Sequence, residues 1–385
     1  MTIGLIAGIL AFTMRPQSFS RRDFLKLSGL GLGALALKPL RRLLPMAQFP
    51  AAERLGRVAI DGKVEVKAAP NDGAVTVKEL YEDAVVEWLR EVVGSKPYYI
   101  NQRWVETPEG YIYASFLQPV RNQPNQPLTA MPEGKPGFWA EVTVPYVDLY
   151  IDNPPPRSPW AKKNIDVYLR NPRLYYSQVV WIDQIRSNEA GQVLYRFNED
   201  PGHGYGYGDI FWADGTACRP LTADDVAPIN PDVDPNEKTI VVNLTYQTLA
   251  CLEGKNEVYF CRISSGAKWD AYGNNVDTWS TPLGELNTHW KTISQHMAGG
   301  TAQIGYDTPA VSWATYVHGD GVAIHAAFWH NDFGSPRSHG CINARPEDAR
   351  WIFRWTTPPV SLEMSEIRMT WPDHGTVVKV EERTF

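Results

Sequence analysis

The sequence predicts a mainly β protein in which small barrels precede a larger β-rich domain with one or two short helices. Thirty prolines and thirty glycines among 385 residues indicate many turns and short strands rather than long helices. Aromatic residues form 12% of the chain, so aromatic packing should dominate the cores. The hydrophobic and charged fractions, 43% and 21%, are typical of a chain that folds into two or three domains.

The charge of the chain is unevenly distributed along its length. The formal net charge is −6, but the first 44 residues contain seven basic residues and a single acid. The remainder therefore holds 30 basic and 42 acidic residues, a net charge of −12. Because nucleic-acid binding relies on clustered lysine and arginine, this acidic body argues against a nucleic-acid partner.

Residues 1–45 are interpreted as an export signal. Paired arginines at positions 21 and 22 precede an apolar, glycine-rich run over residues 27–37, which resembles a twin-arginine signal. Met14 would open a more ordinary signal than Met1. No A-x-A cleavage site is visible, so retention of this segment as a membrane anchor stays open. In either case we expect the body to work outside the cytoplasmic membrane, in the cell envelope or cell wall.

The next segments predict two small barrels joined by a linker. Short strands separated by turn residues are expected over residues 55–120, whose order resembles a bacterial Src-homology-3-like domain. A proline-rich linker is expected over residues 121–144. Residues 145–232 weakly repeat the first segment and predict a second, divergent barrel of this type. Within them, the glycine-rich residues 202–208 lack a Lys-Ser/Thr pair and are interpreted as a hairpin loop, not a nucleotide site.

A third part begins near residue 237 with alternating strand patterns. A turn at residues 253–256 predicts a hairpin that brings Cys251 and Cys261 near each other. Export would permit a disulfide there. A change of register by one residue would put the two on opposite faces, and we expect two separate, partly buried thiols.

The residues suited to chemistry gather between positions 316 and 343. Four of the eight histidines and one of the four cysteines, Cys341, fall in this stretch. A cysteine nucleophile needs an imidazole to take its proton and backbone N–H groups aimed at the developing oxyanion. Gly340 removes side-chain bulk where such amides would point. Pro346, followed by two acids, predicts a helix that begins just after the nucleophile.

Two other interpretations of this cluster compete with catalysis. Cysteine and histidine are zinc ligands, but the spacing here matches no common zinc site, so no metal is expected. A lone cysteine is often an inert core thiol. Polar neighbours such as Ser338 and Asn343 would make a poor core around Cys341.

The spacing of His325, twelve residues, and then Ser-His-Gly-Cys-Ile-Asn at 338–343 closely resembles the signature of L,D-transpeptidase (YkuD-type) catalytic domains. The resemblance covers residues 237–380. It implies that Cys341 is the nucleophile and His325 its general base. It also implies that the backbone carbonyl of Ala326 orients the imidazole and that Gly340 contributes to the oxyanion hole.

The resemblance also implies the substrate. Cys341 would attack the third residue of a peptidoglycan stem tetrapeptide and expel the terminal D-Ala, and the side-chain amine of a neighbouring stem would resolve the thioester into a 3→3 cross-link. No cofactor is implied. Residues with substrate-contact or loop-shaping roles are Tyr316, Trp329, Ser338, His339 and Asn343. The sequence suggests no role for His318 and His330.

Three activities remain compatible with these residues. The first is transpeptidation. The second is a near variant that uses water as the acceptor and trims tetrapeptides to tripeptides. The third is a wall-binding protein whose catalytic-like domain is inactive and whose barrels hold glycan or peptide. An intact His325 and Cys341 favour catalysis, whereas the choice between amine and water depends on the shape and dryness of the pocket.

Overall fold

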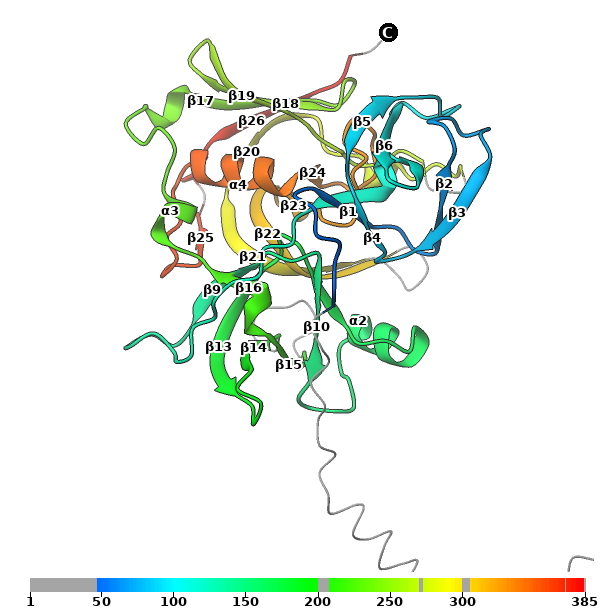
Figure 1. Ribbon diagram of the computed structural model, residues 1–385. Helices are drawn as coiled ribbons and strands as arrows, with labels where there is room; N and C mark the ends of the chain where they lie inside the picture. The colour runs from blue at the N-terminus through cyan, green and yellow to red at the C-terminus, as the bar shows by residue number, and fades with distance from the viewer. Residues whose placement is uncertain (1–46, 200–207, 270–272, 300–304, 371, 384–385) are drawn as a thin grey trace, which may run out of the picture. The chain divides into compact units, whose positions relative to one another are not determined.

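The computed structural model describes residues 47–199, 208–269, 273–299, 305–370 and 372–383. Across these residues the chain is mainly β with a few short helices, so the predicted fold class is confirmed (Figure 1). The export signal and nearly all of the glycine-rich loop lie outside the described residues. Within the described residues, no helix is long and apolar enough to cross a membrane.

Two sheets enclose the core of the first part. Its strands are Leu55–Val58 (β1), Lys63–Lys67 (β2), Thr76–Tyr81 (β3), Val85–Glu87 (β4), Arg90–Val93 (β5), Arg103–Thr107 (β6), Gly110–Tyr113 (β7) and Leu117–Val120 (β8). The sheet orders are β4-β1-β8 and β3-β2-β7-β6-β5. Trp88, Val105, Ile112 and Leu117 are buried between them. This burial follows from the alternation of apolar and polar residues that indicated the strands.

The second part is a six-stranded antiparallel sheet in the order β11-β15-β14-β13-β9-β16, with a separate pair β10-β12. The strands are Phe138–Val142 (β9), Tyr146–Asp148 (β10), Tyr150–Ile151 (β11), Arg173–Tyr175 (β12), Val179–Ser187 (β13), Val193–Asn198 (β14), Ile210–Asp214 (β15) and Cys218–Pro220 (β16), and the helices are Pro159–Lys162 (α2) and Ala223–Val226 (α3). β9 lies in the segment expected as linker. It forms a strand because Phe138, Ala140 and Val142 alternate into the core.

One structural motif occurs in both parts. In the first, β7 leads through the three-residue 3-10 helix Ala114–Phe116 (η1) into β8. In the second, β15 leads through Gly215–Ala217 (η3) into β16. This agreement is consistent with the weak internal repeat in the sequence.

The third part has two five-stranded sheets with a helix against one of them. Its strands are Lys238–Asn243 (β17), Thr248–Glu253 (β18), Asn256–Arg262 (β19), Gly284–Asn287 (β20), Trp290–Gly299 (β21), Tyr306–His318 (β22), Val322–Ala326 (β23), Ile342–Ala344 (β24), Glu366–Arg368 (β25) and Val377–Glu381 (β26). The orders are β19-β18-β17-β26-β20 and β24-β23-β22-β21-β25. Helix Pro346–Trp355 (α4) begins at the proline predicted to start it and packs against β22 and β23 (Figure 1).

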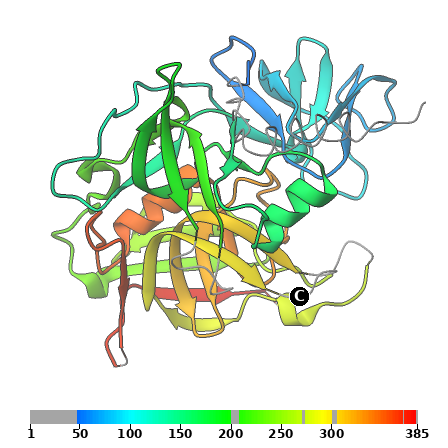
Figure 2. The ribbon, with the colours of Figure 1, turned by 90° about the horizontal axis from the view of Figure 1, so that it is seen from below.

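The core of the third part lies between its two sheets. Ile324 and Ile342 from the second sheet meet Val242 and Val378 from the first, together with Ile352 of α4. The second part packs against the same domain, because the amide of Val179 on β13 donates to Ser312 Oγ on β22 (2.9 Å). Figure 2 shows the green strands of the second part beside the yellow strands β21 and β22.

Cys251 and Cys261 are free thiols, as expected, but they lie on the same face of the sheet, so the register argument that put them on opposite faces is wrong. In the antiparallel pair β18-β19, Cys251 lies opposite Tyr259 and Cys261 lies opposite Leu249. Both side chains are buried in the core between the sheets. Burial raises the pKa of both thiols above their usual range, so they are inert at neutral pH.

Candidate active site

His325 and Cys341 are brought to one face of the sheet by strand alternation. On β23, Val322 and Ile324 point into the core, so Ala323 and His325 point to the opposite face. The parallel pair β23-β24 places His325 opposite Asn343. Cys341 precedes β24 and lies two residues before Asn343, so its side chain shares the face of His325. His325 on β23 and Cys341 just before β24 are sixteen positions apart in sequence, and their side chains therefore lie on the same face of the sheet.

The thiol of Cys341 is half-buried and packs against Tyr316 and Ala323. Its Sγ lies 3.7 Å from the carbonyl oxygen of Gly321. Burial raises the pKa of Cys341 to about 11, although a hydrogen bond from the backbone of Ala323 offsets part of this rise. The thiol of Cys341 is therefore neutral at pH 7, and it would need a base to become a thiolate.

The ring of His325 has the tautomer that such a base needs. Its Nδ1 lies 3.0 Å from the carbonyl oxygen of Ala326, which only accepts hydrogen bonds, so Nδ1 carries the proton. Nε2 is then the basic nitrogen. His325 is 3% exposed, and burial lowers its pKa to about 4. The carbonyl of Ala326 is thus within hydrogen-bond distance of the imidazole, the position that the role implied by the resemblance requires.

The loop before Cys341 is braced by side-chain hydroxyls. The Gly340 amide donates to Ser338 Oγ (3.1 Å), and the Ser338 hydroxyl donates to the carbonyl of Cys341. Thr281 Oγ1 donates to the carbonyl of Gly340 (2.8 Å). Without substrate the Gly340 amide is engaged by Ser338, so the oxyanion role predicted for it stays a prediction. Ser338, predicted to contact substrate, is a buried brace of the loop.

Gly340→Ala is expected to lower turnover about tenfold or more, because a displaced Cys341 loses its alignment. Gly340 has φ +121°, and an added Cβ would meet nothing closer than 3.6 Å. The cost is therefore backbone strain, about 1–3 kcal/mol. Gly319→Ala is the matched control, because nothing lies within 4 Å of its added Cβ. Turnover and melting temperature of both variants test this. Equal turnover of the two would contradict the claim that Gly340 positions the nucleophile.

The predicted contact residues flank the two reactive side chains. Tyr316 is buried and stacks on Trp290, with ring centroids 4.1 Å apart. Burial, followed by the nearby Cys341, raises the pKa of the Tyr316 hydroxyl. Trp329 is half-buried, with its ring centroid 5.8 Å from that of His325. These rings form apolar walls beside the thiol and the imidazole.

His339 stands between two aromatic rings that the sequence did not single out. Its ring centroid lies 4.0 Å from that of Trp279 and 5.3 Å from that of Tyr306. Tyr306 also lies close enough to Cys341 for the charge of a thiolate to raise its pKa, although burial is the larger cause. Neither ring belongs to a local motif with Cys341, because both come from distant segments that only the fold brings together.

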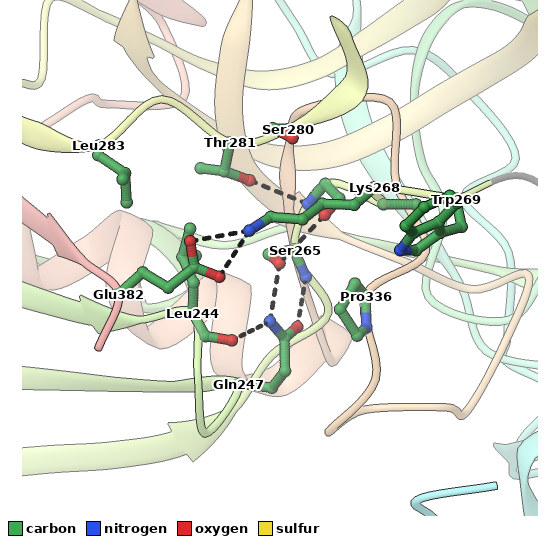
Figure 3. A pocket seen from close by; sticks show the side chains of 12 residues that line it. Leu244, Gln247, Ser265, Lys268, Trp269, Ser280, Thr281, Leu283, Pro336 and Glu382 are labelled. Atoms are coloured by element: carbon green, nitrogen blue, oxygen red, sulfur yellow. Dashed lines mark hydrogen bonds and ion pairs between the residues drawn. The ribbon is translucent and has the colours of Figure 1, made fainter. Parts of the chain in front are cut away.

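A pocket of about 600 Å³ lies beside Thr281, Lys268 and Glu382 (Figure 3). Thr281 lines this pocket and also donates to the carbonyl of Gly340. An ion pair between Lys268 Nζ and Glu382 Oε1 (2.8 Å) crosses it. Neither Cys341 nor His325 is among the residues that line it. Thr281 on the pocket wall thus holds the loop before Cys341, while the pocket itself is lined by neither of the two reactive side chains.

Within the described ranges, no group of three His, Cys, Asp or Glu side chains is arranged to hold a metal ion. His325, His330 and Cys341 are buried or half-buried, but their hydrogen bonds run to backbone and amide groups.

The third part of the chain matches a known family of domains. Residues 237–380 match the family model of the YkuD L,D-transpeptidase catalytic domain. This part of the chain is therefore similar to L,D-transpeptidase catalytic domains. A search of curated proteins found no match to the chain.

Solved L,D-transpeptidase structures resemble the chain at low identity. One from Enterococcus faecium is 23% identical, with a TM-score of 0.29, and the match covers 38% of this chain and 50% of that one. One from Xylanimonas cellulosilytica is 20% identical, with a TM-score of 0.25, and the match covers 37% of this chain and 60% of that one. One from Mycobacterium smegmatis is 17% identical, with a TM-score of 0.29, and the match covers 51% of this chain and 98% of that one. This chain thus spans half the length of the Enterococcus faecium protein.

Proposed function

We propose that this protein is an exported L,D-transpeptidase that forms 3→3 cross-links between peptidoglycan stem peptides. The observation that carries the proposal is the placement of His325 and Cys341 on one sheet face, with Nε2 of His325 unprotonated. The catalytic domain at residues 237–380 supports it. The basic signal at residues 1–45 supports export, and the two β-rich parts before residue 237 would hold the cell wall.

In the proposed first half-reaction, Nε2 of His325 takes the thiol proton as Cys341 Sγ attacks the carbonyl of the third stem residue. The amide of Cys341 donates to the oxyanion. Collapse of the tetrahedral intermediate breaks the peptide bond, and His325 returns its proton to the departing D-Ala amine. A thioester on Cys341 and free D-Ala are the products.

The second half-reaction reverses these roles with a different amine. The side-chain amine of a neighbouring stem attacks the thioester carbonyl, and His325 accepts its proton and returns it to the departing thiol. Tyr306 and Trp329 line a cavity of about 770 Å³ beside the site, which supports the approach of a second peptide from this side. If water attacks instead, the same chemistry trims the stem to a tripeptide.

Product analysis separates the proposed function from its alternatives. The full-length protein is incubated with a disaccharide-tetrapeptide, and the products are identified by mass spectrometry. We expect a cross-linked dimer that has lost one alanine. Tripeptide monomer alone would indicate a carboxypeptidase. Unchanged substrate together with retention of the protein on isolated cell wall would indicate a wall-binding protein and overturn the proposal.

A further inference from the structure

The loop between β23 and β24 contains three buried polar residues that the proposed reaction does not use. His330, Asn331 and Asp332 are 2%, 1% and 6% exposed. Buried polar groups are stable only when they have hydrogen-bond partners. The partners of this trio connect the first part of the chain to Asn343 in the active site.

The first contact runs to η1 of the first part. Asn331 donates through its amide nitrogen to the carbonyl of Ser115 and through Nδ2 to that of Ala114, both at 3.2 Å. The hydroxyl of Ser115 donates to Asp332 Oδ1 (2.7 Å) and accepts from Asn101 Nδ2 (3.0 Å). Because Asn101 occupies the hydroxyl's acceptor position, the Ser115 proton is directed at Asp332. The loop is thus fixed to a barrel more than 200 residues away in sequence.

A buried arginine makes a second contact with the same loop. Arg57 on β1 is 3% exposed, and its Nη2 donates to the carbonyl of Phe328 (3.0 Å). Its Nη1 pairs with Asp83 Oδ1 (2.7 Å), and Nε donates to Gln118 Oε1 (3.0 Å). These partners hold the guanidinium in one orientation, since each uses a different edge of its rigid fork.

His330 transmits the position of this loop to Asn343. The amide of Asp332 donates to His330 Nδ1 (3.1 Å), so the neutral ring carries its proton on Nε2. Burial lowers the pKa of His330, which keeps the ring neutral. Nε2 of His330 lies 3.1 Å from the side-chain atom of Asn343 that is assigned as Nδ2. The other side-chain amide atom of Asn343, assigned as Oδ1, is buried and has no hydrogen-bond partner among the described residues.

Two N–H groups do not hydrogen-bond to each other, so the amide of Asn343 must be turned by 180°. Its oxygen then accepts from Nε2–H of His330. Its NH₂ group takes the position that lacks a partner among the described residues. Asn343 lies opposite His325 in the ladder and two residues after Cys341, so this donor belongs to the face of the reacting groups.

We propose that His330 is a positioning residue that turns the Asn343 NH₂ group toward the reaction centre, and that the first β-rich part holds His330 in place. This inference rests on the proposed acyl transfer. Asn343 donates to the substrate carbonyl oxygen as it becomes an oxyanion, in addition to the backbone N–H groups near Cys341. The first part is therefore a structural component of the active site, beyond any affinity it has for the cell wall.

A double-mutant cycle tests the connection between the two side chains. We expect Asn343→Ala to lower kcat about 10²-fold and His330→Leu to lower it about tenfold, with KM little changed. If His330 acts through Asn343, adding His330→Leu to Asn343→Ala causes no further loss. His330→Gln restores kcat, because its amide places an N–H near the position of Nε2. Independent, additive losses or a failure of the glutamine variant would overturn the proposal.

A matched pair of variants tests the contribution of the first part. Ser115→Ala removes the hydrogen bond to Asp332 and the one that the hydroxyl accepts from Asn101. Thr107→Val also removes two hydrogen bonds, one donated to the carbonyl of Gly110 and one accepted from the amide of Glu109, both within the first part and at similar burial. Both should lower the melting temperature by a similar amount, but only Ser115→Ala should lower kcat, about threefold to tenfold. Equal kcat in the two variants would contradict the role of the first part.

Nitrogen-15 NMR of the histidine-labelled full-length protein tests the arrangement without any turnover. We expect the Nε2–H tautomer of His330 in wild type and a shift of its Nε2 signal in Asn343→Ala. The Nδ1–H tautomer, or an unchanged signal, would overturn the inference. An inactive wild type with the expected NMR result would instead refute the proposed function alone, and the two failures are thus distinguishable.

Discussion

Replacement of Cys341 by alanine is expected to abolish release of D-Ala and cross-linking, with a loss of at least about 10³-fold in turnover. No other described thiol can substitute, because Cys218, Cys251 and Cys261 are buried. The melting temperature should change little, since Cys341 is half-buried and its sulfur lies as far as 3.7 Å from the carbonyl oxygen of Gly321. Rates of D-Ala release by wild type and variant measure the effect.

Cys218→Ala is the matched control for this experiment. Its thiol is buried in the second part, and burial raises its pKa to about 12. We expect turnover within about twofold of wild type, because a small cavity in a separate core costs stability rather than catalysis. Comparable losses in the Cys218 and Cys341 variants would show that the measured activity does not depend on the proposed nucleophile.

The second large effect concerns the ionisation of the thiol and the imidazole. Burial raises the pKa of Cys341 to about 11 and lowers that of His325 to about 4, so both are neutral between these values. Turnover should therefore be lost as pH falls through about 4, where His325 becomes protonated and can no longer accept the thiol proton. His325→Asn should lower turnover about 10²–10⁴-fold at pH 7.

Alkylation of Cys341 by iodoacetamide distinguishes a neutral pair from a preformed thiolate–imidazolium pair. For a neutral pair the thiolate fraction rises with pH up to the thiol pKa, so the rate should increase about tenfold per pH unit between 6 and 10. His325→Asn should leave this rate nearly unchanged, although it abolishes turnover. A plateau near pH 7 that disappears in His325→Asn would contradict the neutral pair and indicate an ion pair.

Much of the fold could be predicted because its cause is local. Alternation of apolar residues marks β2, β17 and β18, and Pro346 with the acids that follow it marks the start of α4. β9 was missed because the prolines before it suggested linker, whereas its apolar residues are buried against β13. The register of β18 and β19, which puts Cys251 and Cys261 on the same face, also depends on a β-bulge that no local pattern indicated.

The candidate site was predictable only where the residues form one motif. His325 and Ala326 lie on β23, and Cys341 immediately precedes the paired strand β24, so the fold brings together the residues of the motif. The hydrogen bond from the Gly340 amide to Ser338 depends on the conformation of the loop, which the amino-acid sequence of the motif does not specify. His330 had no visible role because its support comes from Ser115 and Asn101, more than 200 residues earlier in the chain.

The most direct test of the central claim is the intact mass of the protein during turnover. The full-length chain is mixed with disaccharide-tetrapeptide whose side-chain amine is acetylated, so that no acceptor amine is present, then quenched in acid and digested for peptide mapping. Our account predicts an adduct equal to the donor minus alanine, carried by the peptide that contains Cys341 and absent from Cys341→Ala. Release of alanine with no adduct at early times, or an adduct on another residue, would contradict acyl transfer through Cys341.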